Sequence, residues 1–281
     1  MDRTRAKGML WGLIAGDALG SPIQFSDMDE HPWITEMEPC PMFGGLPPGC
    51  WTDDGSMAMC IMDSYIRRGG YDLKDVGDTF VKWLREGYLS SQEGKSFDVG
   101  NATMDACRNI AFKREYVNGS ENSQGNGSIM RFAPSYLLAK KEGSAERAKE
   151  IMHKISDLTH NSQRVREVVD RMALILDEHM AGRRTAEVSS CKTRSEVNNS
   201  GWAVSTLDAA LWAFNASATF EEGMIAAVNL GGDSDTIGAV FGQIAGAFYG
   251  FEAIPKRWVQ AVKTWEKVDA FIERFLDAVE V

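Results

Sequence analysis

The sequence predicts an all-α protein, and three observations support this fold class. Apolar residues recur every three or four positions in six segments, which is the period of an amphipathic helix. The strict alternation of apolar and polar residues that indicates a half-buried strand is nearly absent. Two further apolar segments, near the two ends of the chain, carry a glycine at every fourth position. The six periodic segments are residues 73–86, 100–115, 145–158, 163–180, 203–216 and 255–278.

The glycine-spaced segments are the N-terminal element and a C-terminal counterpart. Their glycines stand at positions 8, 12, 16 and 20 and at positions 238, 242, 246 and 250. A glycine inside a helix costs about 1 kcal/mol relative to alanine, so this pattern needs a compensating gain. The usual compensating gain is the close approach of two helix backbones. We therefore expect both helices to lie in the core and to touch each other or a shared neighbour.

Residues 21–51 are predicted to form a long irregular connection, because prolines stand at positions 22, 32, 39, 41, 47 and 48. A loop longer than about 15 residues inside a compact domain is usually functional or disordered. The aromatic residues Phe25, Trp33 and Phe43 indicate that this loop packs against the protein. We expect it to cover part of the functional site.

Shorter loops are predicted at residues 69–70, 118–127 and 192–201, where glycine and small polar residues separate the periodic segments. None of them marks a clear domain boundary. A chain of 281 residues that is 44% hydrophobic can bury one large core. We therefore expect a single domain over residues 1–281.

Charge and cysteine content exclude several classes of protein. The net charge is −10 and the lysines and arginines are scattered, which argues against nucleic acid as a partner. The five cysteines stand at positions 40, 50, 60, 107 and 191. They lack the Cys-x-x-Cys spacing of zinc sites, and their odd number argues against a framework of disulfides. The apolar start of the chain resembles a signal peptide, but Asp17 interrupts it, which argues against secretion. No segment has the roughly 18 uninterrupted apolar residues of a membrane span. We expect a monomeric, cytoplasmic protein with no membrane partner.

Two clusters of oxygen-bearing side chains stand at predicted helix starts, far apart in the chain. Carboxylates and hydroxyls so placed can cap a helix N-terminus, and capping explains either cluster alone equally well. They are also the ligands that a hard divalent cation prefers. Together the clusters hold more oxygen-bearing side chains than two caps need, which favours a two-metal site. Its candidate ligands are Thr52, Asp53, Asp54, Asp233, Asp235 and Thr236.

Four sequence blocks together resemble the ADP-ribosylglycohydrolase family. They occur in the family's order, from about residue 8 to residue 250, at residues 16–20, 51–57, 126–131 and 231–236. The resemblance implies a compact orthogonal multi-helix bundle. It also implies a binuclear Mg²⁺ or Mn²⁺ centre held by the six candidate ligands, which orients the distal ribose of ADP-ribose. The absence of histidine and cysteine from both clusters disfavours zinc and copper.

The segment Asp98-Val99-Gly100-Asn101 is similar to a block of the branch typified by the dinitrogenase-reductase-activating glycohydrolase, which removes ADP-ribose from arginine. In that branch the aspartate is the proposed acid/base, so Asp98 is the catalytic candidate and Asn101 a ligand-binding candidate. Burial or a neighbouring anion would raise the pKa of Asp98 toward neutrality, which suits this role. The alternative is that Asp98 caps the following helix.

Further residues are expected to bind the rest of the ligand. The loop formed by Asn126, Gly127 and Ser128, with Ile129 and Met130, corresponds to the family's pyrophosphate loop. Backbone N–H groups at such a helix entrance can face an anion. By itself the tripeptide would indicate only a turn, and the following arginine, at position 131, is compatible with an ordinary surface charge.

Two ring-bearing residues complete the expected site. His160 matches a family position near the ADP-ribose pocket, although a solitary histidine at a helix end is often a cap or a core residue. Trp202 stands where relatives commonly have a tyrosine that stacks on adenine, and it could equally be a core residue.

Gln24 departs from the family pattern, because many relatives have a glutamate there that binds metal in the serine-directed branch. Glutamine cannot ionise, so the serine-directed mechanism is disfavoured. More of the acid/base catalysis is then expected of Asp98. Asp17 is expected to support the metal ligands without binding the metal itself.

The sequence thus predicts a metal-dependent hydrolase that cleaves the N-glycosidic bond between ADP-ribose and an arginine of a modified protein, with ADP-ribose as product. The alternatives are another linkage (serine, ester, nucleic-acid base or free nucleotide) and a catalytically silent ADP-ribose-binding relative.

Overall fold

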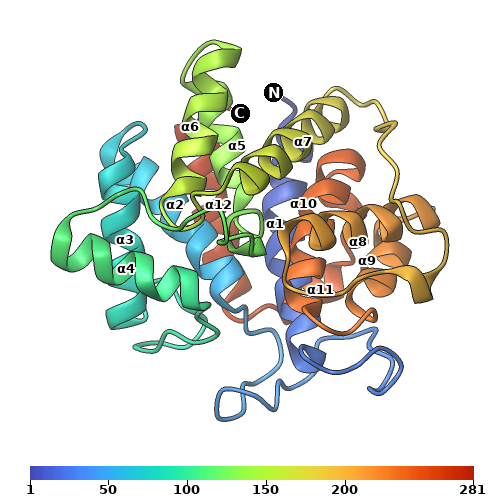
Figure 1. The fold of residues 1–281 in the computed structure, drawn as a ribbon. Coiled ribbons are helices and arrows are strands. Elements are labelled where there is room, and N and C mark those ends of the chain that lie inside the picture. Colours follow the sequence, from blue (N-terminus) through green and yellow to red (C-terminus); the bar gives the residue numbers. More distant parts are fainter.

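The computed structural model describes residues 1–281 and contains helices but no β-sheet, as Figure 1 shows. The predicted all-α fold is therefore confirmed. The α-helices are α1 (Arg3–Gly20), α2 (Asp53–Arg68), α3 (Leu73–Glu86), α4 (Asn101–Lys113), α5 (Phe132–Lys141), α6 (Ala145–Asp157), α7 (Gln163–Met180), α8 (Ala203–Ala216), α9 (Phe220–Val228), α10 (Ser234–Tyr249), α11 (Lys256–Ala261) and α12 (Trp265–Ala278).

The periodic segments agree with these helices in all but one case. Residues 73–86, 163–180 and 203–216 match α3, α7 and α8, and two other segments differ by one or two residues at their ends. The continuous helix expected over residues 255–278 is wrong, because the chain breaks between α11 and α12. There the Lys263 amide donates a hydrogen bond to the carbonyl of Gly49, at 2.9 Å, and Thr264 adopts a φ of 53°. This contact with a distant loop interrupts a run that contains no internal glycine or proline.

Helices α1 and α10 lie side by side at the centre of the fold (Figure 1), in contact through their glycines as the sequence predicts. A Cβ atom added at Gly12 would lie 2.1 Å from the carbonyl oxygen of Gly242, and one at Gly16 would lie 2.1 Å from that of Gly238. The last glycine of α1, Gly20, meets the backbone of Asp235 in the same way. The close contact therefore fixes the N-terminus of α10, with its aspartates, against the C-terminal end of α1.

Residues 21–51 form the expected irregular connection, apart from a short 3₁₀ turn at Ser21–Ile23. The expectation that its aromatic residues pack it down is wrong for Phe25 and Trp33, which are 62% and 58% exposed. The loop is held instead by buried Ile34, whose backbone N–H and C=O both bond to the side-chain amide of Asn229, each at 2.7 Å. Phe43 is half-buried against Phe97, with ring centroids 5.4 Å apart.

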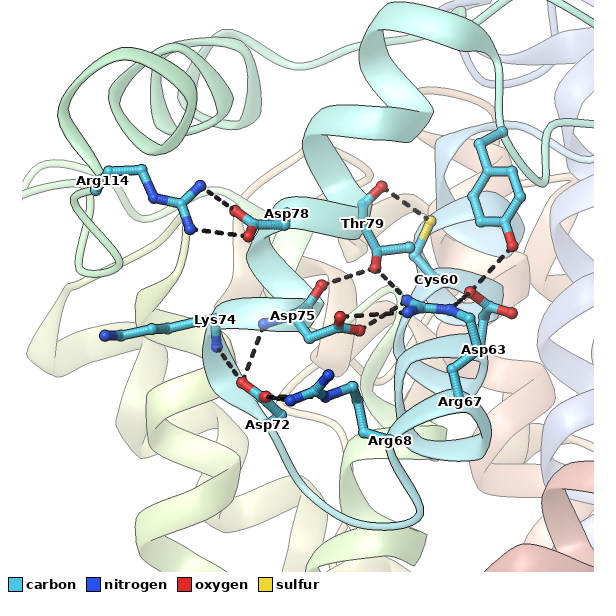
Figure 2. Close-up of polar contacts among 11 residues, drawn as sticks. Cys60, Asp63, Arg67, Arg68, Asp72, Lys74, Asp75, Asp78, Thr79 and Arg114 are labelled. Atoms are coloured by element: carbon cyan, nitrogen blue, oxygen red, sulfur yellow. Dashed lines mark hydrogen bonds and ion pairs between the residues drawn. The ribbon is translucent and has the colours of Figure 1, made fainter.

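The C-terminal half of α2 is joined to α3 by a network of ion pairs, drawn in Figure 2. Arg67 lies 2.7 Å from carboxylate oxygens of both Asp63 and Asp75, and it also donates to the hydroxyl of Thr79 at 3.0 Å. Gly69 then ends α2 in the left-handed conformation that favours glycine. These contacts set the orientation of α2 and so of its N-terminus.

The structure also bears on the chain's environment. None of its helices is both long and apolar enough to cross a lipid bilayer. The five cysteines form no disulfide, and four of them are buried. The main hydrophobic core contains 74 buried residues and includes the facing sides of α1 and α10.

Candidate active site

The two predicted ligand clusters lie at the N-termini of α2 and α10, and the fold brings them together. The Thr52 hydroxyl lies 3.2 Å from a carboxylate oxygen of Asp54 and 3.5 Å from one of Asp235, a residue 183 positions away in the chain. All three residues are buried, behind the more accessible Asp53, Asp233 and Thr236.

Helix capping does not account for the side chains of Thr52 and Asp233. Thr52 and Asp233 occupy the N-cap positions of α2 and α10, yet neither side chain accepts a hydrogen bond from its helix. The N-terminus of α2 is instead satisfied by Asp17 of α1, whose carboxylate accepts from the amides of Thr52 and Gly55, both at 2.8 Å. The supporting position expected for Asp17 is therefore observed.

The site concentrates negative charge that no basic group neutralises. Burial raises the pKa values of Asp53, Asp54 and Asp235 well above the usual range, and repulsion between neighbouring carboxylates raises them further. Burial also raises the pKa of Asp17 to about 7. None of these carboxylates forms an ion pair with a lysine, arginine or histidine. The electrostatic potential therefore favours a bound cation.

The donor atoms fit a hard divalent cation. One carboxylate oxygen of Asp54, Oδ1, is buried without a hydrogen-bond partner, and such an orphaned acceptor would be satisfied by a metal ion. No three carboxylate, imidazole or thiolate groups are gathered closely enough to hold one ion by themselves. An ion here would therefore need the hydroxyls of Thr52 or Thr236, backbone carbonyls or water in addition to the aspartates.

A cavity of about 750 Å³ opens over the acidic cluster. Its size is in the range of small-molecule binding sites. Most of the residues predicted from the sequence line it, and they come from α2, α4, α10 and the loops between the helices. These lining residues are Asp53, Asp98, Asn101, Asn126, Gly127, Met130, His160, Asp233 and Thr236.

Other predicted residues do not line the cavity. The Ser128 hydroxyl donates to that of Ser156 at 2.6 Å, and Ile129 is fully buried in the core. Trp202 is 63% exposed, so the core alternative for this residue is wrong. It stands next to Gly201, which does line the cavity, and its backbone pairs with that of Gly125. The indole therefore lies at the rim.

Asp98 extends from the segment before α4 into this cavity. Its backbone has a φ of 57°, in the left-handed region that is unfavourable for residues other than glycine and is frequent at functional sites. Gly100 holds the N-cap position of α4, so Asp98 is not the cap. Burial raises the pKa of Asp98, whose carboxyl group lies beside Asp235 and Gln24. The side-chain amide of Gln24 is itself buried without a hydrogen-bond partner.

Arg131 is not a surface charge, because it is only 1% exposed, and the corresponding expectation is wrong. Its guanidinium donates to the carbonyl oxygen of Gly127 and packs over the ring of Phe80, with 4.8 Å from Cζ to the centroid. Burial lowers its pKa to about 10. His160, which lines the cavity, is 4% exposed, and burial and the charge of Arg131 lower its pKa to about 3. The imidazole is therefore neutral at physiological pH.

The cavity is also lined by residues that were not among the predicted site residues. Phe25 and Phe43 come from the connection over residues 21–51, which therefore covers part of the site as expected. Asp105 lies one helical turn after Asn101 on α4, and this i, i+4 spacing could have identified it. Residues 122–125 are polar and carry no periodic signal, so only the structure places them here.

Comparisons with known proteins identify the family of this chain. The family model described as ADP-ribosylglycohydrolase matches residues 1–281. The chain is 33% identical to the ADP-ribosylarginine hydrolase Tri1 of Pseudomonas putida, over 97% of this chain and 78% of that protein. It is 29% identical to the ADP-ribosyl-[dinitrogen reductase] glycohydrolase of Rhodospirillum rubrum, over 98% of this chain and 95% of that protein.

Among solved structures, an ADP-ribosylglycohydrolase-related protein complex is similar to this fold with a TM-score of 0.81 and 34% identity. The match covers 98% of both chains. The family model, the relatives and the fold all extend over essentially the whole chain. The protein therefore belongs to the ADP-ribosylglycohydrolase family and is an enzyme of the glycosyl-hydrolase type.

Proposed function

We propose that this enzyme hydrolyses the N-glycosidic bond between ADP-ribose and an arginine side chain of a modified protein. The observation that carries the proposal is the placement of Asp98, a half-buried carboxyl group at the wall of a ligand-sized cavity, next to an acidic cluster without basic partners. Two relatives whose names state an ADP-ribosylarginine or ADP-ribosyl-protein substrate, from P. putida and R. rubrum, support the choice of linkage.

In this reaction a water oxygen forms a bond to the anomeric carbon of the distal ribose, and the bond from that carbon to the guanidine nitrogen breaks. The water gives up a proton and the departing guanidine nitrogen takes one. Asp98 is the group proposed to transfer these protons. A pKa raised by burial suits this role because a general acid–base group works best when its pKa is closer to the operating pH than that of an exposed aspartate.

The metal centre is the second part of the proposal. Thr52, Asp53, Asp54, Asp233, Asp235 and Thr236 would hold two Mg²⁺ or Mn²⁺ ions. Such ions orient a vicinal diol and stabilise negative charge on oxygen. In the protein, Asp17 holds the amides of Thr52 and Gly55 and so keeps these ligands in place. Asn126 donates to Asp233 and to the hydroxyl of Thr206, which orients the Asp233 carboxylate.

The rest of the ligand is assigned to other residues that line the cavity and to its rim. The backbone of the loop from Asn126 to Met130 would face the pyrophosphate, with His160 packed against Gly127 of this loop. Asn101 of α4, which also lines the cavity, would contact the ligand. Trp202, exposed at the rim, would stack on the adenine, since an indole offers a large flat apolar surface.

The proposal is tested by measuring ADP-ribose release from two matched peptides, one modified on arginine and one on serine, with Mg²⁺ or Mn²⁺ and with chelator. We expect release from the arginine-linked peptide that requires the metal. Asp98→Asn should slow release by about 10²- to 10⁴-fold while ADP-ribose still binds. Asp105→Asn, which changes another carboxylate of the same cavity, serves as the control and should retain turnover.

The outcomes separate the parts of the proposal. Release from the serine-linked peptide alone would contradict the arginine linkage. Activity that survives exhaustive chelation would remove the metal centre. If neither peptide is cleaved but ADP-ribose binds tightly, the protein is an ADP-ribose-binding relative rather than a hydrolase of these linkages.

A further inference from the structure

Arg131 is a fully buried guanidinium without a carboxylate partner, close to the ligand cavity but not lining it. It forms no ion pair, although a buried charge is costly unless it is well hydrogen-bonded. Its Nη1 donates to the Gly127 carbonyl and its Nη2 donates to the hydroxyl of Thr159, the latter at 2.7 Å. Both acceptors belong to segments that form the wall of the cavity. The position of Arg131 thus points to a role in shaping that wall.

The hydrogen bond from Arg131 to Thr159 determines which atom accepts the hydrogen of the Thr159 hydroxyl. Thr159 is fully buried, and its Oγ1 has two neighbours, Nη2 of Arg131 and Nδ1 of His160, each at 2.7 Å. Arg131 can only donate, so Oγ1 accepts from it. The single hydroxyl hydrogen then has one available acceptor, Nδ1 of His160. An Nδ1–H tautomer of His160 would leave the buried hydroxyl hydrogen without an acceptor.

The remaining ring nitrogen, Nε2, is left to carry the proton and forms no hydrogen bond within the protein. The ring lies against two glycines of the cavity wall: a Cβ atom at Gly127 would be 2.7 Å from Cε1, and one at Gly125 would be 3.3 Å from Nε2. The absence of side chains there lets the imidazole reach the cavity. Burial keeps the ring neutral, since the pKa of His160 is lowered to about 3.

We propose that Arg131 and Thr159 are positioning residues that hold neutral His160 in its Nε2–H tautomer, so that Nε2–H serves as a fixed donor to an anionic oxygen of the ligand. The chain of donors runs from Arg131 to Thr159 to His160 and ends in the cavity. This inference rests on the proposed function for the nature of the ligand, whose pyrophosphate would supply the anionic oxygen. A neutral donor so fixed recognises the anion without changing its own charge between about pH 5 and 9.

The first test reads the tautomer directly in the ligand-free protein by ¹⁵N NMR of the histidine rings. The chain has only four histidines, so a His160→Phe variant assigns the signals of His160. We expect a protonated Nε2 and an unprotonated Nδ1 at neutral pH. An Nδ1–H tautomer or an imidazolium at that pH would overturn the inference. This measurement needs neither activity nor a ligand, so it is independent of the proposed function.

The second test measures ADP-ribose affinity by calorimetry. Thr159→Val keeps the shape of the side chain but removes the hydroxyl, and we expect it to weaken binding about 3- to 10-fold. His160→Phe removes the donor itself and should weaken binding about 10- to 100-fold, the range for a hydrogen bond to a charged group. Thr159→Ser, which keeps the hydroxyl, should bind as the wild type does.

Unchanged affinity in Thr159→Val would overturn the positioning role, and unchanged affinity in His160→Phe would overturn the donor role. Wild-type protein that binds no ADP-ribose would refute both the donor role and the proposed function. If ADP-ribose binds as expected but the arginine-linked peptide is not cleaved, only the proposed reaction fails. Arg131→Lys provides a further check, because it keeps the charge but loses the paired donors, and it should shift the His160 signals if the variant folds.

Discussion

The two ends of α2 hold carboxylates in opposite situations. At the C-terminal end, Asp63 and Asp75 are paired with Arg67, which is 43% exposed (Figure 2). At the N-terminal end, Asp53 and Asp54 are buried beside further aspartates and have no basic partner. Asp53, Asp54 and Asp63 all belong to this helix of 16 residues, and Asp75 belongs to the neighbouring α3.

The difference separates carboxylates that stabilise the fold through ion pairs from carboxylates that have no such partner. Ion pairs with a partly exposed arginine contribute modestly to stability. Buried, unpaired carboxylates repel one another, which destabilises the folded protein unless a cation or protons neutralise them. A cluster of the second kind is therefore expected where a cation binds, and the aspartates near the N-termini of α2 and α10 form such a cluster.

The largest expected effect comes from changing Asp98, which faces the cavity beside the unpaired cluster. Asp98→Asn should lower kcat for the arginine-linked peptide by about 10²- to 10⁴-fold, the usual contribution of general acid–base catalysis. Asp75→Asn, in the paired network, should leave kcat unchanged. Steady-state kinetics of both variants with saturating Mn²⁺ provide the measurement. Similar activity in Asp98→Asn and the wild type would remove the distinction between the two regions.

The second effect concerns stability in the presence of a cation. A ligand at 100 times its Kd stabilises a protein by about 2.7 kcal/mol, so Mn²⁺ should raise the Tm of the wild type and of Asp75→Asn by the same amount. In Asp54→Asn the increase should be largely lost. Without metal this variant should be more stable than the wild type, because it has one buried charge fewer. Thermal unfolding with and without Mn²⁺ tests both statements, and an equal increase in all three proteins would refute the assignment of Asp54.

A third, smaller effect is a dependence of the Mn²⁺ stabilisation on pH. The pKa values of Asp53, Asp54 and Asp235 are raised in the metal-free fold, and that of Asp17 is raised to about 7. The metal-free folded state therefore binds more protons than the unfolded state, and its free energy of unfolding decreases as pH rises from about 4 to 7. Cation binding requires the deprotonated carboxylates, so it counteracts this decrease in the free energy of unfolding.

The stabilisation by Mn²⁺ should thus be larger at about pH 7.5 than at about pH 5.5. Buried neutral His160 and His179, with pKa values lowered to about 3 and about 4, produce the opposite slope in the metal-free protein. They contribute equally with and without the cation, so the difference between the two stability curves isolates the carboxylates. Urea unfolding at the two pH values provides this difference, and a stabilisation that shrinks as pH rises would contradict the prediction.

Local sequence patterns were sufficient for much of the fold. Helical periodicity located α3, α7 and α8, and the glycine spacing identified the contact between α1 and α10, because both signals depend on residues within a few turns of one another. The break before α12 depends on the contact between Lys263 and Gly49, which are far apart in the chain. No local pattern contains that information.

In the candidate site too, the sequence identified some residues, whereas tertiary contacts determine the positions of others. Asp53 and Asp235 were identified from their type and spacing, and Asp98 from the resemblance to the family. The structure brings these three residues together. Arg131 was not recognised as buried, because an arginine that bonds to a carbonyl and a hydroxyl has no partner visible in the sequence. The exposure of Phe25 and Trp202 likewise follows from the tertiary arrangement and not from their apolar character.

The smallest expected effect belongs to the paired network itself. Asp75→Asn removes the ion pair with Arg67, and since the arginine is 43% exposed, solvent screening limits the loss of stability to about 0.3–1 kcal/mol. The loss should shrink as salt is added, because exposed charges are screened, whereas the effect of Asp54→Asn should depend much less on salt. Urea unfolding at low and high NaCl tests this contrast. If the two variants respond alike to salt, burial is not what distinguishes the two ends of α2.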